Sequence, residues 1–140
     1  MILYCDTSAL LKLYIAEPFS GRVKARLAEA EAVAVCRISW AEAHAALARR
    51  AREVAADAEA IAQAKQALAR DWPHYAILDA DQALVEQAGE FASAFALRGY
   101  DSVQLAAAHR VSRVSQTTVC FACFDVRLNQ AAKALGMTCL

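Results

Sequence analysis

The segment MILYCDTS, residues 1–8, carries an uninterrupted apolar run that stops at an acidic residue. Residues 1–5 contain no charge, a pattern typical of a short strand that is buried on both faces of a parallel sheet. Asp6 ends the run, so we expect its side chain at the rim of the sheet, with the hydroxyl groups of Thr7 and Ser8 beside it.

Short apolar runs and helical periods alternate along the rest of the chain. Further strands are expected at residues 32–36, at 75–78, within 117–124 and at 137–140. Helices are expected to begin near Leu10, Phe19, Ser39, residue 56, Asp79 or Asp81, Asp101 and Asp125, the first one reaching as far as Pro18. This order predicts an α/β fold with a central, mainly parallel sheet of four to five strands flanked by helices.

Composition and charge narrow the possible classes of protein. The chain has 140 residues, enough for one domain, and its 15 basic and 15 acidic side chains cancel, so any nucleic-acid contact must come from local charge. Arg49, Arg50, Arg52 and Arg98 are candidates for phosphate contacts, although a charge run also suits a solvated helix face. Five cysteines, no charged leader and no long apolar segment predict a soluble, cytoplasmic protein with no membrane partner.

Four acidic residues stand where a strand is expected to end or a helix to begin: Asp6, Glu42, Asp101 and Asp125. Each could simply cap a helix, and Glu42 would do so with Ser39 in a capping box. In parallel sheets, however, ligands bind beyond the carboxyl ends of the strands. If the four carboxylates converge there, they form oxygen ligands for a hard cation such as Mg²⁺ or Mn²⁺, which could activate a water against a phosphodiester.

Four segments carry a resemblance to a known family. They are YCDTSAL at residues 4–10, SWAE at 39–42, LRGYDSVQLA at 97–106 and FDVRLNQAA at 124–132, with Leu135 and Gly136 close behind. In this order and spacing the chain resembles PIN-domain ribonucleases, and more closely the VapC-type toxins of bacterial toxin–antitoxin pairs. The resemblance covers residues 1–140 as one PIN domain. Ser102 departs from it, because the family more often has a small apolar residue after the Asp.

The resemblance implies a metal-dependent endoribonuclease that hydrolyses single-stranded or looped RNA with a metal-activated water. It implies that Asp6, Glu42, Asp101 and Asp125 are catalytic and hold Mg²⁺ or Mn²⁺, that Thr7 and Ser8 hydrogen-bond within the site, and that Asn129 contributes to it. The implied partners are RNA, a cognate antitoxin whose carboxyl segment covers the active-site groove, and a second copy in a homodimer.

Other functions fit the sequence less well. A phosphatase of the haloacid-dehalogenase type needs a second Asp two residues after the first, where Ser8 stands, and a receiver domain needs a strand-borne Lys, whereas Lys133 is expected in a helix. A non-catalytic interaction module with the same fold stays open as an alternative. Cys120 and Cys123 have the spacing of a redox motif, but within a strand they would point to opposite faces, so we interpret them as buried apolar residues.

Overall fold

The chain forms a five-stranded sheet in which every strand pairs with its neighbours in parallel. The computed structural model describes all of residues 1–140. The strands, in the spatial order β3-β2-β1-β4-β5, are β1 (Ile2–Cys5), β2 (Ala32–Cys36), β3 (Ala76–Leu78), β4 (Val119–Ala122) and β5 (Thr138–Cys139). The sheet therefore confirms the predicted parallel α/β class, with the amino-terminal strand at its centre.

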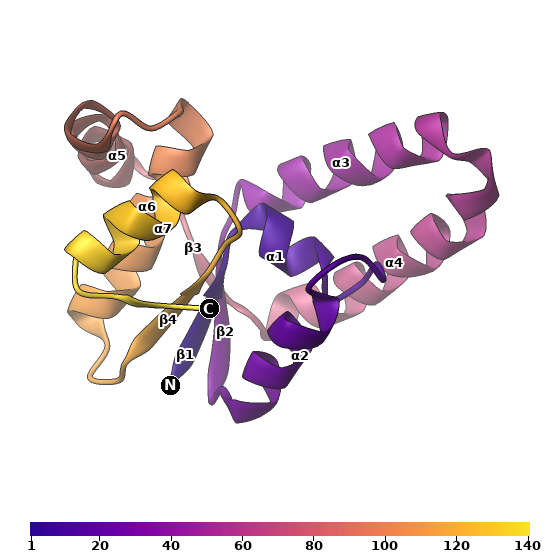
Figure 1. Cartoon of the computed structure of the whole chain (residues 1–140), viewed down its shortest axis with the longest axis horizontal. Helices are drawn as coiled ribbons and strands as arrows, with labels where there is room; N and C mark the ends of the chain where they lie inside the picture. The colour runs from indigo at the N-terminus through magenta and orange to yellow at the C-terminus, as the bar shows by residue number, and fades with distance from the viewer.

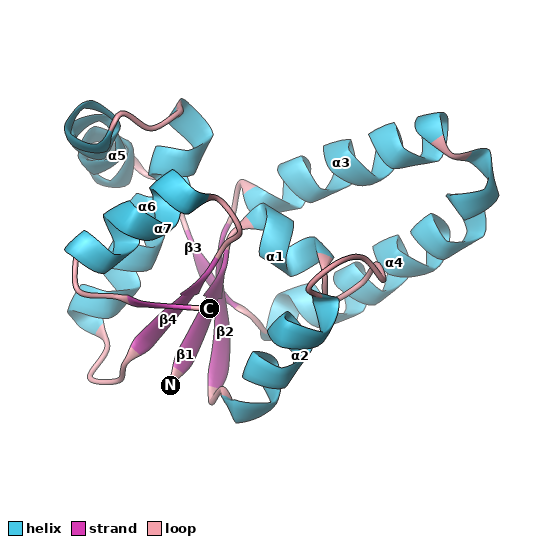
Figure 2. Cartoon of the chain, in the orientation of Figure 1, coloured by secondary structure: helices cyan, strands magenta, loops and turns pink.

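Seven α-helices and two 3-10 helices connect the strands and cover both faces of the sheet (Figures 1 and 2). They are α1 (Thr7–Leu11), α2 (Ser20–Glu29), α3 (Ser39–Glu53), η1 (Ala55–Asp57), α4 (Ala58–Asp71), η2 (Trp72–His74), α5 (Gln82–Phe95), α6 (Gly99–Val114) and α7 (Val126–Ala134). No helix is long and apolar enough to span a membrane.

Side chains of successive strand residues point alternately into two apolar layers. Tyr4 packs into a layer shared with α5, α6 and α7, while Leu3 and Cys5 pack into a layer shared with α1, α2, α3 and α4. Cys120 and Cys123 lie in opposite layers, both buried and unpaired, as their place in and just beyond a strand predicted. Burial on both faces explains why the strands are continuously apolar rather than alternating.

Helices α3 and α4 lie side by side and extend away from the sheet as an arm (Figure 1). The arm has its own small apolar cluster, in which Leu47 of α3 meets Ile61 and Ala64 of α4, and Ile15 joins them from the loop after α1. The basic residues Arg49 to Arg52 therefore lie along this arm and not on the sheet.

Three local predictions differ from the structure. The first helix ends at Leu11, well before Pro18, because the following residues form turns and the hydroxyl of Tyr14 bonds to Asp71 and Tyr75 instead. The capping box is absent, since Ser39 lies inside α3 and the backbone N–H of Glu42 bonds to Ile38. Asp101 does not cap α6 but lies within its first turn.

Burial predicts a large difference between two identical substitutions. Leu10 of α1 is 0 % exposed beneath the sheet edge, whereas Leu27 of α2 is 36 % exposed. We expect Leu10→Ala to lower the free energy of unfolding by about 2–5 kcal/mol, because it leaves a cavity, and Leu27→Ala to lower it by less than about 1 kcal/mol. Urea unfolding followed by circular dichroism measures both, and equal losses would contradict the assigned packing.

Candidate active site

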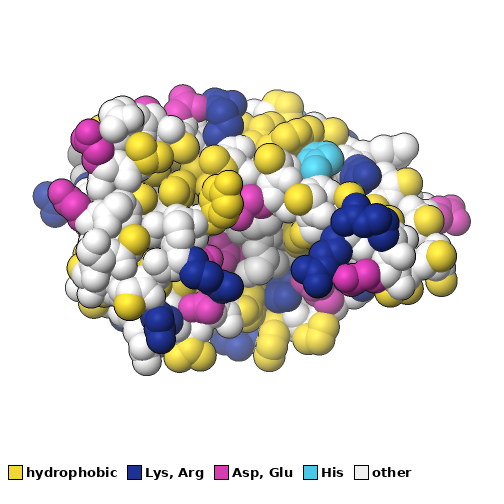
Figure 3. Space-filling view, turned by 90° about the horizontal axis from the view of Figure 1, so that it is seen from above, with side chains coloured by type: hydrophobic (Ala, Val, Ile, Leu, Met, Phe, Trp, Pro, Cys, Tyr) yellow, Lys and Arg dark blue, Asp and Glu magenta, His cyan; other side chains and the backbone are white.

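The four acidic residues lie near the point where the order of the strands in the sheet reverses, beside β1. From β1 the chain builds β2 and β3 on one side, and later adds β4 and β5 on the other. Asp6 follows β1 directly, and Asp125 lies three residues beyond β4. Together with Glu42 from α3 and Asp101 from α6, they line one cavity of about 510 Å³. Figure 3 shows a hollow near the centre of this face, with acidic side chains in it and basic side chains on either side.

Asp6 and Asp125 have similar local roles at the ends of their strands. Asp6 Oδ1 caps α1 by accepting a hydrogen bond of 2.8 Å from the backbone N–H of Ala9, and it accepts a second bond of 2.8 Å from the Ser8 hydroxyl. Asp125 Oδ1 caps α7 by accepting a 2.8 Å bond from the N–H of Leu128. The capping interpretation is therefore correct for both residues, and it leaves the second carboxylate oxygen of each without a protein partner.

Glu42 and Asp101 are held by side chains rather than by helix ends. Glu42 Oε1 accepts hydrogen bonds from the Thr7 hydroxyl at 2.7 Å and from Gln104 Nε2 at 2.9 Å. Asp101 Oδ2 accepts a 3.2 Å bond from Nε of Arg98, whose side chain is 85 % exposed. Here too, one oxygen of each carboxylate is bonded and the other has no protein partner.

The four unpartnered oxygens are Asp6 Oδ2, Glu42 Oε2, Asp101 Oδ1 and Asp125 Oδ2. No buried side-chain oxygen in the molecule lacks a hydrogen-bond partner, so all four are reached by solvent. No three of the His, Cys, Asp and Glu side chains stand close enough to hold one ion between them. In the type of donor atom alone, these carboxylates suit a cation such as Mg²⁺, which binds one or two of them directly and keeps several waters.

Asp6 is the most deeply buried of the four carboxylates, with only 8 % of the residue exposed. Burial above all, and to a smaller extent the charges of Asp101 and Glu42, raise the pKa of Asp6 from 3.8 to about 6, although the bonds from Ala9 and Ser8 lower it. A nearby cation would relieve both effects.

The structure brings most of the predicted site residues together, and one stays outside. Thr7 and Ser8 line the cavity, as their predicted hydrogen bonds require. Asn129 does not line it; its amide bonds to the carbonyl of Cys123 and to that residue's thiol. Gln104 lines the cavity but was not predicted, although it follows Asp101 by one helical turn, a spacing that places both on one face of α6.

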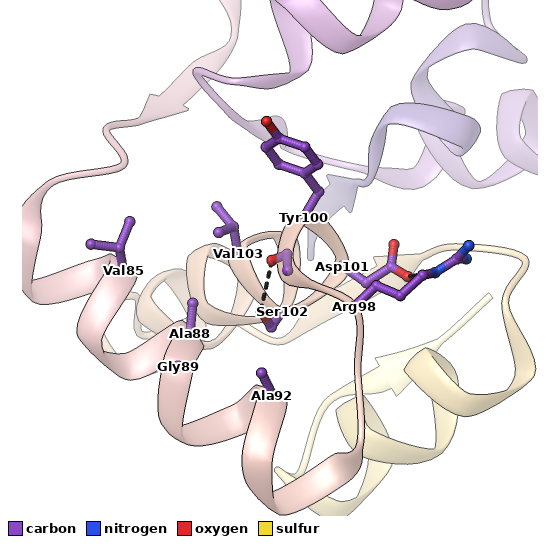
Figure 4. A pocket seen from close by; sticks show the side chains of 10 residues that line it. Val85, Ala88, Gly89, Ala92, Arg98, Tyr100, Asp101, Ser102 and Val103 are labelled. Carbon is purple, nitrogen blue, oxygen red and sulfur yellow. Dashed lines mark hydrogen bonds and ion pairs between the residues drawn. The ribbon is translucent and has the colours of Figure 1, made fainter.

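Two further cavities adjoin the acidic one, and all three share Arg98 and Asp101. One, of about 640 Å³, lies between α5 and the start of α6 and is mostly apolar (Figure 4). The other, of about 740 Å³, lies beside the start of α7 and includes Arg127. We refer to these three adjoining cavities together as the groove. Of the predicted basic residues, Arg98 lines it, whereas Arg49 and Arg50 form ion pairs on the arm.

Comparisons with known proteins agree with this architecture. A family model described as the PIN domain matches residues 3–133. Two relatives from Mycobacterium tuberculosis, ribonuclease VapC45 of strain CDC 1551 / Oshkosh and ribonuclease VapC49 of strain ATCC 25618 / H37Rv, are each 31% identical over 135 residues, which cover 96% of this chain and 92% of the relative.

Solved structures with much lower identity share the fold. PAE2754 from Pyrobaculum aerophilum has a TM-score of 0.67 at 21% identity and covers 99% of this chain and 89% of its own. FitAcB from Neisseria gonorrhoeae has the same TM-score and identity and covers 100% of this chain and 96% of its own. A chain of a toxin-antitoxin complex from Klebsiella pneumoniae reaches 0.58 at 16% identity, with 86% and 84% covered.

The raised pKa of Asp6 predicts how stability depends on pH when no divalent cation is present. The folded chain keeps a proton with a pKa of about 6 that the unfolded chain releases near 3.8. Stability should therefore fall as pH rises between these values, by up to about 3 kcal/mol, and remain lower at neutral pH. Asp6→Asn keeps a capping side chain without the charge, so it should raise the neutral-pH melting temperature measured in EDTA.

Asp81→Asn provides the matched control for this measurement. Asp81 also caps a helix, through the N–H of Leu84, but Arg110 holds the pKa of its carboxyl below the usual range. Removing its charge should therefore lower the neutral-pH melting temperature, the opposite sign. If Asp6→Asn lowers it as well, the pKa of Asp6 is not raised in the folded chain.

Proposed function

This chain belongs to the PIN domain family, and from that premise we propose that it is a metal-dependent endoribonuclease and the toxin of a toxin–antitoxin pair. The observation that carries the proposal is the acidic cavity, where Asp6, Glu42, Asp101 and Asp125 each keep one carboxylate oxygen free of the protein. Support for the RNA substrate comes from the mycobacterial relatives, which are named as ribonucleases.

The cation proposed for this site is Mg²⁺ or Mn²⁺, held by Asp6, Glu42, Asp101 and Asp125, some of them directly and the others through the waters that such an ion keeps. The donor chemistry fits, because hard cations prefer carboxylate oxygens and the four side chains have their remaining oxygens anchored by donors of the protein. When bound, such a cation lowers the pKa of a water and stabilises negative charge on a phosphodiester.

The chain's own residues prepare the site for that chemistry. The helix caps at Asp6 and Asp125 fix these two carboxylates on the sheet edge, so little reorganisation is needed when a ligand arrives. Thr7 donates a hydrogen bond to Glu42, and Ser8 donates one to Asp6, which favours the ionised form of Asp6. Arg98 neutralises part of the charge at Asp101 and, being exposed, can turn toward a phosphate.

The groove formed by the three cavities is the proposed path of the RNA. A single strand lying in it would pass the acidic cavity with Arg98 at the junction and Arg127 at one end. These side chains would contact phosphates, which position a strand without reading its sequence. Arg49 and Arg52, on the exposed side of the arm, would extend the contact.

The remaining parts of the proposal concern assembly. We propose that residues 1–140 act as one PIN domain in the cytoplasm, form a homodimer and bind an antitoxin whose carboxyl segment covers the groove. The relatives of VapC type support the pairing with an antitoxin, and the Klebsiella pneumoniae complex contains a chain of the same fold.

Cleavage of RNA tests the proposed activity directly. Purified protein should cut a single-stranded RNA with Mg²⁺ or Mn²⁺ and stop in EDTA. Asp6→Asn should lower the cleavage rate by about 100-fold or more, because even residues that only support metal ligands are worth about 10–100-fold. Asp81→Asn, which alters a cap on α5 outside the acidic cavity, should cleave normally. Equal rates for wild type and Asp6→Asn would point to a contaminating nuclease.

Binding of the cation can be tested without any substrate. A ligand that binds only the folded chain stabilises it, by about 2.7 kcal/mol at 100 times the dissociation constant, which corresponds to a rise in melting temperature on the order of 10 °C. We expect this rise with Mn²⁺ for wild type and a much smaller one for Asp6→Asn. The same small shift in both proteins would remove the metal site from the proposal.

A further inference from the structure

We infer that Gln104 is a positioning residue: its amide, held at the oxygen end by Tyr4, binds one carboxylate oxygen of Glu42 and so fixes the orientation in which the other oxygen is left for the cavity. The inference rests on the proposed function for the role of Glu42. Gln104 is only 3 % exposed, which is unusual for glutamine, and its amide has polar partners on β1, α1 and α3. A buried amide with this many partners has little freedom to turn.

The amide nitrogen of Gln104 has two hydrogens, and both are used. Nε2 lies 2.9 Å from Ser39 Oγ and 2.9 Å from Glu42 Oε1, with Thr7 Oγ1 more distant at 3.3 Å. A carboxylate only accepts hydrogen bonds, so the end of the amide that faces Glu42 must be the nitrogen. If the amide were reversed, two oxygens would face each other in a buried position, which is costly.

Tyr4 supplies the constraint at the other end of the amide. Its hydroxyl donates a 2.7 Å bond to Gln104 Oε1, and the ring is completely buried in the layer between the sheet and α6. Because the amide oxygen of Gln104 can only accept, the Tyr4 hydroxyl must be the donor in this bond. Hydrogen bonds are thus donated in one direction, from Tyr4 in the core to Gln104 and from Gln104 to Glu42 at the cavity.

The two carboxylate oxygens of Glu42 therefore have different surroundings. Oε1 accepts from Gln104 and from Thr7, which itself donates its only hydroxyl hydrogen there at 2.7 Å. Oε2 has no protein partner and is reached by solvent. Because Glu has a long and flexible side chain, without these two donors its carboxylate would sample other orientations, so Gln104 decides how often Oε2 is presented to the cavity.

Three variants separate positioning from packing. Gln104→Met keeps the length of the side chain but removes the donor to Glu42. Tyr4→Phe keeps the ring and the amide but removes the bond that holds the oxygen end of the amide. Ser39→Ala is the matched control, because it removes a buried partner of the same Gln104 nitrogen, on the same helix as Glu42, and leaves the bond to Glu42 in place.

Crystal structures of the variants provide a readout that needs no cleavage. We expect the Glu42 carboxylate to leave its position in Gln104→Met and to stay in Ser39→Ala. An unmoved Glu42 in folded Gln104→Met overturns the inference. If Gln104→Met does not fold, Tyr4→Phe decides: an unmoved Gln104 amide and an unmoved Glu42, together with wild-type cleavage, overturn it.

Steady-state kinetics on RNA provide the second readout. Gln104→Met should lower kcat by about 10–100-fold and leave KM almost unchanged, because the change affects orientation of Glu42 rather than RNA binding. Tyr4→Phe should lower kcat by about fivefold, the value of one neutral hydrogen bond. Ser39→Ala should retain the wild-type kcat; a loss as large as that of Gln104→Met would mean that the network only supports folding.

The two proposals can fail separately. If the wild-type protein does not cleave RNA with either cation, the proposed function is wrong, and the position of Glu42 in the variant structures still decides whether Gln104 controls it. If the wild type cleaves and Gln104→Met cleaves equally well, the function stands and the positioning role is wrong.

Discussion

The central position of β1 constrains everything else in this molecule. It pairs with β2 on one side and β4 on the other, and both of its faces are buried, so the strand has no freedom to shift or tilt. Asp6 follows it immediately, which places a carboxylate at a fixed point beyond the sheet edge. Thr7 and Tyr4, on either side of this point, connect it to Glu42 and Gln104. The position of the acidic cavity is thus determined by the position of β1.

Four carboxylates line the acidic cavity, so like charges lie near one another there. One oxygen of each is anchored by a donor of the protein: two helix caps at Asp6 and Asp125, an arginine at Asp101, and a buried amide at Glu42. Removing any one anchor would free a charged side chain rather than simply lose a contact. Stability and the shape of the site are for this reason coupled, as they often are where strain or charge is stored.

The sequence predicts the features that depend on apolar periodicity and on the order of elements along the chain. Apolar runs located all five strands, and the acidic residues at their ends located the cavity, because carboxyl ends of parallel strands must share an edge. It was misleading at Ser39, where local spacing suggested a capping box. Instead, the Ser39 hydroxyl accepts a hydrogen bond from the buried amide of Gln104, 65 residues further along the chain. No local sequence pattern encodes a partner at that distance. Asn129 lies outside the cavity for a related reason, because its amide donates a hydrogen bond to the carbonyl of Cys123.

Cys120 and Cys123 lie in opposite apolar layers, as described above. Together with the other three cysteines, they determine how the chain reacts with thiol reagents. All five thiols are free, four are buried, and burial raises the pKa of each. Since only the thiolate reacts with alkylating reagents, labelling of the four buried thiols, those of Cys5, Cys36, Cys120 and Cys123, must wait until the sheet opens. The rate at which these thiols are alkylated therefore reports how often the central strands open, and no probe has to be introduced to measure it.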